Sequence, residues 1–181
     1  MQRIACLGWG SLIWNPCCLP VSGHWCNDGP MIEVEFARKS RDGRVTLVLC
    51  KTDQPVQSLW CLLNVQDLNE AICRLACREQ TEKVNIGRWP QTQEPSRVEF
   101  IHGLSTWAQS KKLDGVVWTD LPPKFDRSYE MPTLAQVQAY VEEEKAKRSG
   151  KYDLIKEYVF KTPIKIVTPY RPTIEGILGS P

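Results

Sequence analysis

The sequence predicts an α+β protein, a small mixed or antiparallel β-barrel flanked by helices, as a single domain over residues 1–181. Short apolar or alternating segments follow one another early in the chain, separated by Gly, Pro, Asn and Asp. This order is typical of strands that pair antiparallel and form a closed or half-closed barrel. Amphipathic helix patterns come later. With 42% hydrophobic and 24% charged residues, the chain has enough apolar surface for one core.

The predicted strands differ in their pattern of burial. Residues 3–7 are apolar almost throughout, whereas residues 31–37 alternate apolar and charged side chains, as in a sheet with one face in water. A polar loop ending in Gly43 leads to a Val- and Leu-rich strand over residues 44–50. Residues 17–30, rich in Pro, Gly, Cys and Asn, are interpreted as a long connection. Further strands are predicted over residues 58–63, 97–101, 114–119 and 164–167.

The first convincing helix covers residues 67–79. Asp67 and Glu70 are spaced as a capping pair, and an apolar stripe of Leu68, Ala71, Ile72, Leu75 and Ala76 follows the helical period. A loop is expected over residues 87–95. Further helices are predicted over residues 106–112, 133–148 with Thr133 as N-cap, and 152–160, before an irregular, Pro-rich tail.

Charge and hydropathy exclude several classes of protein. The formal net charge is +2, and no cluster of Lys and Arg forms the basic footprint of a nucleic-acid-binding protein. No stretch approaches membrane-spanning length, and the first residues lack a secretory pattern. We therefore expect a cytoplasmic protein without a nucleic-acid or membrane partner.

Eight cysteines are expected to be reduced thiols, because a chain of this size does not need disulfides to be stable. Cys17, Cys18, His24 and Cys26 are zinc-ligand types within ten residues. Adjacent cysteines are poorly placed to chelate one tetrahedral ion, so we predict no metal and interpret the segment as a loop of reduced cysteines.

A sharp turn is predicted where the first strand runs into Gly8-Trp9-Gly10-Ser11. Residues without a Cβ tolerate backbone angles that others resist. Such a turn can direct several backbone N–H groups into one concavity, which binds a carboxylate or a developing oxyanion. The loop is therefore a candidate substrate cradle; the alternative is a tight turn between two core strands.

Glu79 is the candidate proton-transfer residue. It continues the apolar stripe of its helix, four residues after Leu75, where a carboxylate is unusual. Burial and the negative end of the helix dipole both disfavour its charged form, which suits a proton shuttle near neutral pH. The alternative is a Glu at a frayed helix end, tied to a nearby Lys or Arg. The neighbour Arg78 is expected to point in a different direction on the helix.

The run from Gly8 to Pro16, Gly-Trp-Gly-Ser-Leu-Ile-Trp-Asn-Pro, resembles the signature loop of the γ-glutamylcyclotransferase-like superfamily, most closely its ChaC-type branch. The resemblance resumes at residues 43–47 (Gly-Arg-Val-Thr-Leu) and 78–80 (Arg-Glu-Gln), and so covers about the first half of the chain. Trp9 departs from the family, which usually has Tyr there. An indole N–H donates a hydrogen bond but does not accept one.

The resemblance implies an enzyme that releases 5-oxoproline from a γ-glutamyl peptide or γ-glutamyl amine by attack of the substrate's own α-amino group. It implies Glu79 as the catalytic acid and base. Trp9, Gly10, Ser11 and Leu12 would be the substrate-binding residues. A small-molecule γ-glutamyl substrate is the implied partner, and no cofactor is implied.

Two rival functions remain open from the sequence. The first is a non-catalytic binding module for γ-glutamyl or related amino-acid ligands, which the Trp9 departure and the unmatched second half favour. The second is a Cys-dependent hydrolase that uses His102. Neither rival accounts for both the Gly-Trp-Gly-Ser-Leu loop and a glutamate on an apolar helical stripe.

Overall fold

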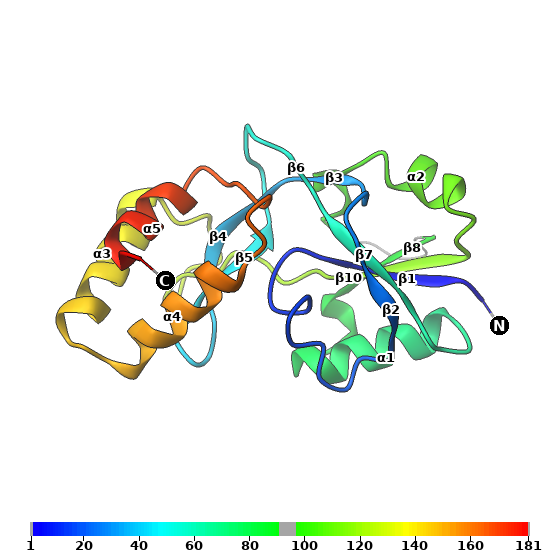
Figure 1. The fold of residues 1–181 in the computed structure, drawn as a ribbon, viewed down its shortest axis with the longest axis horizontal. Helices are drawn as coiled ribbons and strands as arrows, with labels where there is room; N and C mark the ends of the chain where they lie inside the picture. Colours follow the sequence, from blue (N-terminus) through cyan, green and yellow to red (C-terminus); the bar gives the residue numbers. More distant parts are fainter. Residues whose placement is uncertain (1, 91–96, 181) are drawn as a thin grey trace. The chain divides into compact units, whose positions relative to one another are not determined.

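A computed structural model describes residues 2–90 and 97–180 of the chain (Figure 1). The fold is α+β, with mixed and antiparallel sheets. Its strands and helices divide into two compact units, each built from separate stretches of the chain. The first unit comprises residues 1–32 and 57–121, and the second comprises residues 33–56 and 122–181. The single-domain organisation expected from the sequence stays a prediction.

The first unit is built on a five-stranded sheet in the order β2-β7-β1-β10-β8. The central strand β1 pairs antiparallel with β7 and parallel with β10, and all its residues are buried. The elements of this unit are β1 (Ile4–Gly8), β2 (Val21–Cys26), β3 (Met31–Ile32), β7 (Leu59–Leu63), α1 (Leu68–Glu79), the 3-10 helix η1 (Lys83–Asn85), β8 (Ile86–Trp89), the 3-10 helix η2 (Val98–Phe100), β9 (Ile101–His102), α2 (Leu104–Ser110) and β10 (Gly115–Thr119).

Helices cover both faces of this sheet. On one face, apolar side chains of α1 form a core cluster with alternate residues of the strands, among them Cys6, Cys61 and Val117. On the other face, Trp107 of α2 makes an edge-to-face contact with Trp60 at 5.4 Å between ring centroids. Side chains alternate along a strand, so the neighbours Trp60 and Cys61 point to opposite faces of the sheet: Cys61 faces α1, and Trp60 faces α2.

The second unit packs helices against the antiparallel hairpin of β4 (Val34–Lys39) and β5 (Val45–Leu49). Gly43, in the hairpin loop, has φ +89°, a left-handed conformation that favours glycine. Three helices complete the unit: α3 (Leu134–Ala146), α4 (Gly150–Lys161) and α5 (Arg171–Leu178). The short strand β6 (Val56–Gln57) lies where the chain passes between the units, in a three-stranded sheet of order β6-β3-β9.

The helices are the elements that the sequence predicts best. Asp67 caps α1 by accepting a hydrogen bond from Glu70 N, and Thr133 forms a capping box with Gln136 at the start of α3. The strands over residues 3–7, 44–50, 58–63 and 114–119 are confirmed as β1, β5, β7 and β10. The α+β class is confirmed. The barrel is not seen, because the strands of the described residues form open sheets without a closing pair.

Several predicted segments are wrong. The segment over residues 17–30, predicted to be a connection, contains the edge strand β2. Its polar Ser-Gly-His run lacks the alternation of apolar and polar residues that predicts a strand. Residues 31–37 are not one strand but parts of β3 and β4, which lie in different sheets. Residues 97–101 are mostly the 3-10 helix η2, and residues 164–167 are not a strand. The first part of the expected loop 87–95 is strand β8, and residues 91–95 lie outside the described residues. The tail contains α5, which starts with Pro172 in its first turn.

Candidate functional site

The loop after β1 follows directly from the buried strand. Its turn is closed by backbone hydrogen bonds from Ile13 N to Gly10 O at 3.0 Å and from Asn15 N to Ser11 O at 2.9 Å. The glycines do not act as predicted, because neither Gly8 nor Gly10 has a positive φ. Gly8 is required for close packing instead, since a Cβ there would lie 2.6 Å from the ring of Trp25.

No described residue accepts a hydrogen bond from the backbone N–H of Gly10, Ser11 or Leu12. The side chains of Trp9 and Leu12 are buried at 5% and 6% exposure, and Leu12 belongs to the core cluster. The loop therefore offers its backbone and the Ser11 hydroxyl to a ligand. Three consecutive amides without a partner are typical of an anion-binding nest.

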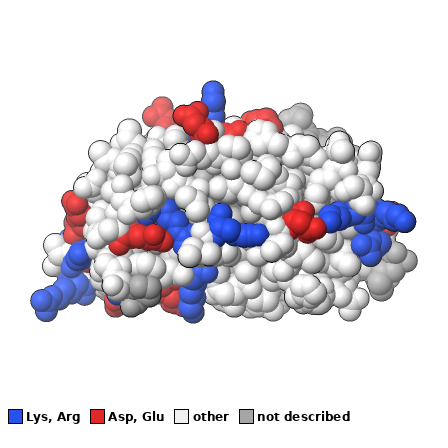
Figure 2. All heavy atoms as spheres, turned by 45° about the horizontal axis from the view of Figure 1, so that its top comes forward, with Lys and Arg blue, Asp and Glu red and all other residues white. Residues whose placement is uncertain are grey.

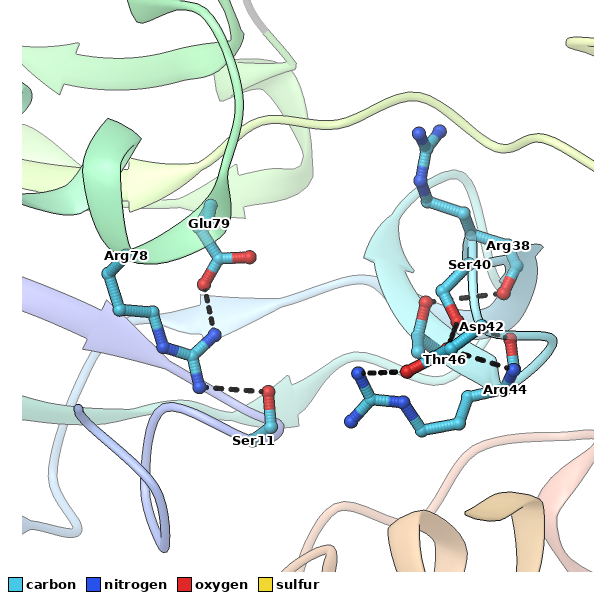
Figure 3. A network of polar contacts seen from close by, with 8 residues as sticks. All are labelled: Ser11, Arg38, Ser40, Asp42, Arg44, Thr46, Arg78 and Glu79. Atoms are coloured by element: carbon cyan, nitrogen blue, oxygen red, sulfur yellow. Dashed lines mark hydrogen bonds and ion pairs between the residues drawn. The ribbon is translucent and has the colours of Figure 1, made fainter. Parts of the chain in front are cut away.

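Arg78 joins the end of α1 to this loop (Figure 3). Its Nη1 donates to Glu79 Oε1 at 2.5 Å, and its Nη2 donates to Ser11 Oγ at 3.1 Å and to Asn15 O at 2.6 Å. The expectation that Arg78 would point away from Glu79 is wrong. Helix α1 ends at Glu79, and the long Arg78 side chain reaches both the carboxylate and the loop.

Glu79 lies at the C-terminus of α1, where Gln80 takes a left-handed conformation with φ 51° and ends the helix. The side chains of Arg78 and Glu79 are 10% and 15% exposed, so the ion pair is largely buried. One carboxylate oxygen, Oε1, is held by Arg78, and the other, Oε2, has no hydrogen-bond donor among the described residues.

The buried β1 residue Cys6 is subject to the charges of the ion pair. Burial above all, together with the charges of Cys61 and Glu79, raises the pKa of the Cys6 thiol, and the Arg78 charge opposes this. Burial also raises the pKa of Cys61 to about 12. Thiols held protonated in this way are poor nucleophiles.

The predicted zinc-ligand types are spread over the segment before and within β2. Cys17, Cys18 and His24 are exposed, and Cys26 is half-buried at the end of β2. No three potential metal ligands among His, Cys, Asp and Glu come together in residues 2–90 and 97–180. All eight cysteines are free, and His102 is exposed on β9.

The second block of the resemblance, residues 43–47, belongs to the β4–β5 hairpin of the second unit. There Arg44 Nη2 pairs with Asp42 Oδ2 at 2.7 Å, and Ser40 Oγ donates to Asp42 Oδ1 at 2.6 Å (Figure 3). These contacts close the hairpin loop on itself. The side chains that assemble the candidate site come from the first unit alone.

Comparisons with known proteins give no family for the chain: no protein-family model matches it, and no curated protein matches it in sequence. None of the helices described here has the length and apolar composition needed to cross a membrane. On the molecular face drawn in Figure 2, acidic and basic side chains of the described residues are interspersed, without a large area of one sign.

Sequence reasoning brings Glu79 and Ser11 into one site but misses the role of Arg78. From sequence, Arg78 is expected to point away from Glu79 on the helix. The available signal was its position beside Glu79 at the end of the helix, with a side chain long enough to span to a loop.

Proposed function

We propose that this protein is a γ-glutamylcyclotransferase-type enzyme, which releases 5-oxoproline from a γ-glutamyl peptide or γ-glutamyl amine. One observation carries the proposal: Arg78 bridges the Glu79 carboxylate to the Ser11 loop, while Glu79 Oε2 and the loop amides have no partners among the described residues. A proton acceptor and a set of N–H donors at one site are the groups that amide-bond transfer requires.

In the proposed reaction, the substrate's α-amino nitrogen attacks its own γ-carbonyl carbon. Glu79 takes one proton from the α-ammonium group, and the new C–N bond closes the five-membered ring; the ring nitrogen gives up its second proton to water, because 5-oxoproline keeps a single N–H. The bond between the γ-carbon and the leaving nitrogen then breaks, and Glu79 returns its proton to that nitrogen. Since both reacting atoms belong to one molecule, the site accelerates the reaction mainly by holding the chain in a folded conformation.

The loop amides have the complementary role. The N–H groups of Gly10, Ser11 and Leu12 would hold the oxyanion that develops on the γ-carbonyl or the α-carboxylate of the substrate. Arg78 holds this loop and Glu79 in a fixed position relative to each other through its hydrogen bonds. The scheme needs no cofactor. We also propose a γ-glutamylcyclotransferase-like fold and a cytoplasmic location for the enzyme.

The test is release of 5-oxoproline from a panel of γ-glutamyl compounds that includes glutathione, γ-glutamyl amino acids and γ-glutamyl amines. Loss of a general acid and base lowers a rate by about 100- to 10,000-fold, so Glu79→Gln should be nearly inactive while its circular dichroism and melting temperature stay close to wild type. Glu82→Gln is the matched control, because Glu82 is exposed just beyond α1 and makes no capping hydrogen bond.

Equal rates for Glu79→Gln and wild type would refute the assigned role of Glu79. No turnover of any compound by wild type, with binding of one of them in calorimetry, would favour the binding-module alternative instead. The Cys-dependent alternative has its own test. Alkylation of the exposed thiols Cys17, Cys18 and Cys77 should leave 5-oxoproline release unchanged, whereas a thiol enzyme that uses one of them would lose its activity.

A further inference from the structure

Two consecutive side chains of β10 each carry a buried polar atom without a hydrogen-bond partner. They are the indole Nε1 of Trp118 and the hydroxyl Oγ1 of Thr119. Buried polar atoms in proteins are nearly always hydrogen-bonded, because an unpaired one lowers the free energy of unfolding. Each of these two therefore requires a physical explanation.

Packing accounts for Trp118. The side chain is fully buried, and it lies so close to Gly87 of β8 that a Cβ on that glycine would be 2.1 Å from Nε1. Trp118 pairs directly with Gly87 in the antiparallel ladder. The glycine backbone fills the space beside the indole N–H, so no ligand has access to it.

Thr119 has a different environment. It is the last residue of β10 and only half-buried as a residue, although its hydroxyl oxygen is buried. Its direct partner is Ile86, which belongs to the core cluster under α1, as does Val117 two residues earlier. Because side chains alternate along a strand, Thr119 projects from the sheet face that α1 covers.

Thr119 also lies at the end of the sheet where the candidate site is. The parallel register pairs Cys6 with Val117, each two residues before the end of its strand, so Gly8 and Thr119 end β1 and β10 at the same edge of the sheet, where the loop begins. Arg78 joins Ser11 of that loop to Glu79. After Glu79 the chain returns through η1 directly into Ile86, the partner of Thr119.

We propose that Thr119 is a substrate-positioning residue, whose hydroxyl hydrogen-bonds the α-amino-acid end of the γ-glutamyl substrate. A hydroxyl both accepts from an amino group and donates to a carboxylate, and an α-amino acid presents both groups together. The proposal includes a rotation of about 120° about χ1 on substrate binding, which moves the oxygen from its buried position to another staggered position. The inference rests on the proposed cyclotransferase function and assigns the part of the substrate that is recognised.

The experiment compares Thr119→Val, which removes only the hydroxyl, with Thr119→Ser, which keeps it. We expect Thr119→Val to lower kcat/KM by at least about tenfold, mainly through KM, because a hydrogen bond to a charged group is lost. Thr119→Ser should recover most of that loss. The melting temperature of Thr119→Val should equal or exceed that of wild type, since its unpaired hydroxyl is gone and its volume is kept. Thr106→Val, at an exposed site on α2, is the control.

A purely structural threonine gives the opposite pattern. If wild type turns over substrate and Thr119→Val keeps its kcat/KM, or loses activity and melting temperature together, the inference is wrong and the proposed function stands. If wild type binds γ-glutamyl compounds without turnover, a tenfold weaker Kd for Thr119→Val supports the inference, and an equal Kd overturns it. If wild type neither turns over nor binds any compound, the proposed function fails and this inference fails with it.

Discussion

Glu79 in the first unit and Glu35 in the second are carboxylates placed among apolar residues, but their partners differ. Glu35 is fully buried, and its two oxygens accept hydrogen bonds from Phe36 N at 2.7 Å, Thr168 Oγ1 at 2.6 Å and Tyr170 N at 2.9 Å. Glu79 is partly exposed, with Arg78 on one oxygen and no partner on the other within the described residues.

The difference separates a carboxylate whose two oxygens are both hydrogen-bonded from one that has an oxygen without a partner among the described residues. Glu35 ties β4 to the segment before α5, and its hydrogen bonds leave no position for a substrate.

Arg171 in the second unit and Arg78 in the first show the same contrast. Arg171 directs its donors to Glu175 and to carbonyl oxygens at the end of α4 and beyond. Arg78 directs its donors to the catalytic candidate and to a loop with open amides. Complete saturation of a buried charge indicates a role in stability.

The largest effect is expected from Glu35→Ala. The variant leaves two buried donors and one partly buried donor without an acceptor, and each unpaired buried donor costs about 1–3 kcal/mol. We expect a loss of about 3 kcal/mol or more in the free energy of unfolding, measured by urea denaturation. Glu142→Ala, on the exposed face of α3, should lose less than about 0.5 kcal/mol. Equal losses for the two variants would show that Glu35 is not the structural tie described here.

The next largest effect is expected at Arg78, the hydrogen-bond partner of Glu79. Arg78→Met removes the hydrogen bonds to Glu79, Ser11 and Asn15, so the loop and the carboxylate lose their common anchor. On the proposed function, we expect kcat/KM for 5-oxoproline release to fall by about 10- to 100-fold, the loss of one or two charge-assisted hydrogen bonds.

Two further variants test whether this effect is specific. Arg78→Lys keeps the charge but not the branched geometry, and should recover only part of the rate. Arg74→Met, one turn earlier on α1, removes only an exposed ion pair with Glu70 and should keep the wild-type rate. If Arg74→Met and Arg78→Met behave alike, the bridge has no special role.

The parts of the fold that local sequence determines could be predicted from it. The caps at Asp67 and Thr133 are read from neighbouring residues, and β1 is apolar enough to be central in any sheet. The failures depend on distant partners. β2 is an exposed edge strand that exists because β7 pairs with it, and residues 31–37 split because the chain leaves one unit for the other at that point.

The candidate site also contains features that local sequence predicts and features that depend on distant residues. The helical period predicts Glu79 on the apolar stripe, and the turn residues predict the loop. The Arg78 bridge depends on a loop residue 67 positions away in sequence, Ser11, and no local pattern contains it. The unpaired Thr119 hydroxyl is also invisible to the sequence, because it is defined by the lack of a partner in the folded chain.

The smallest expected effect is the pH dependence that Glu35 contributes. Burial raises the pKa of Glu35 above its ordinary value of 4.5, although its hydrogen bonds with Thr168, Phe36 and Tyr170 oppose the shift. Between 4.5 and the raised value, the folded protein holds a proton that the unfolded chain has released. The stability contributed by Glu35 is therefore complete below its unfolded pKa and is lost as pH rises through its folded pKa.

The measurement is urea denaturation between about pH 4 and 8 for wild type and for Glu35→Gln, whose amide does not titrate in this range. The difference in free energy of unfolding, wild type minus variant, should fall with rising pH by no more than about 1.4 kcal/mol per pH unit. Carboxylates with lowered pKa values, such as Asp42, contribute equally to both proteins and cancel in the difference. A difference that rises with pH would mean that the hydrogen bonds outweigh burial, and that Glu35 is ionised in the folded protein.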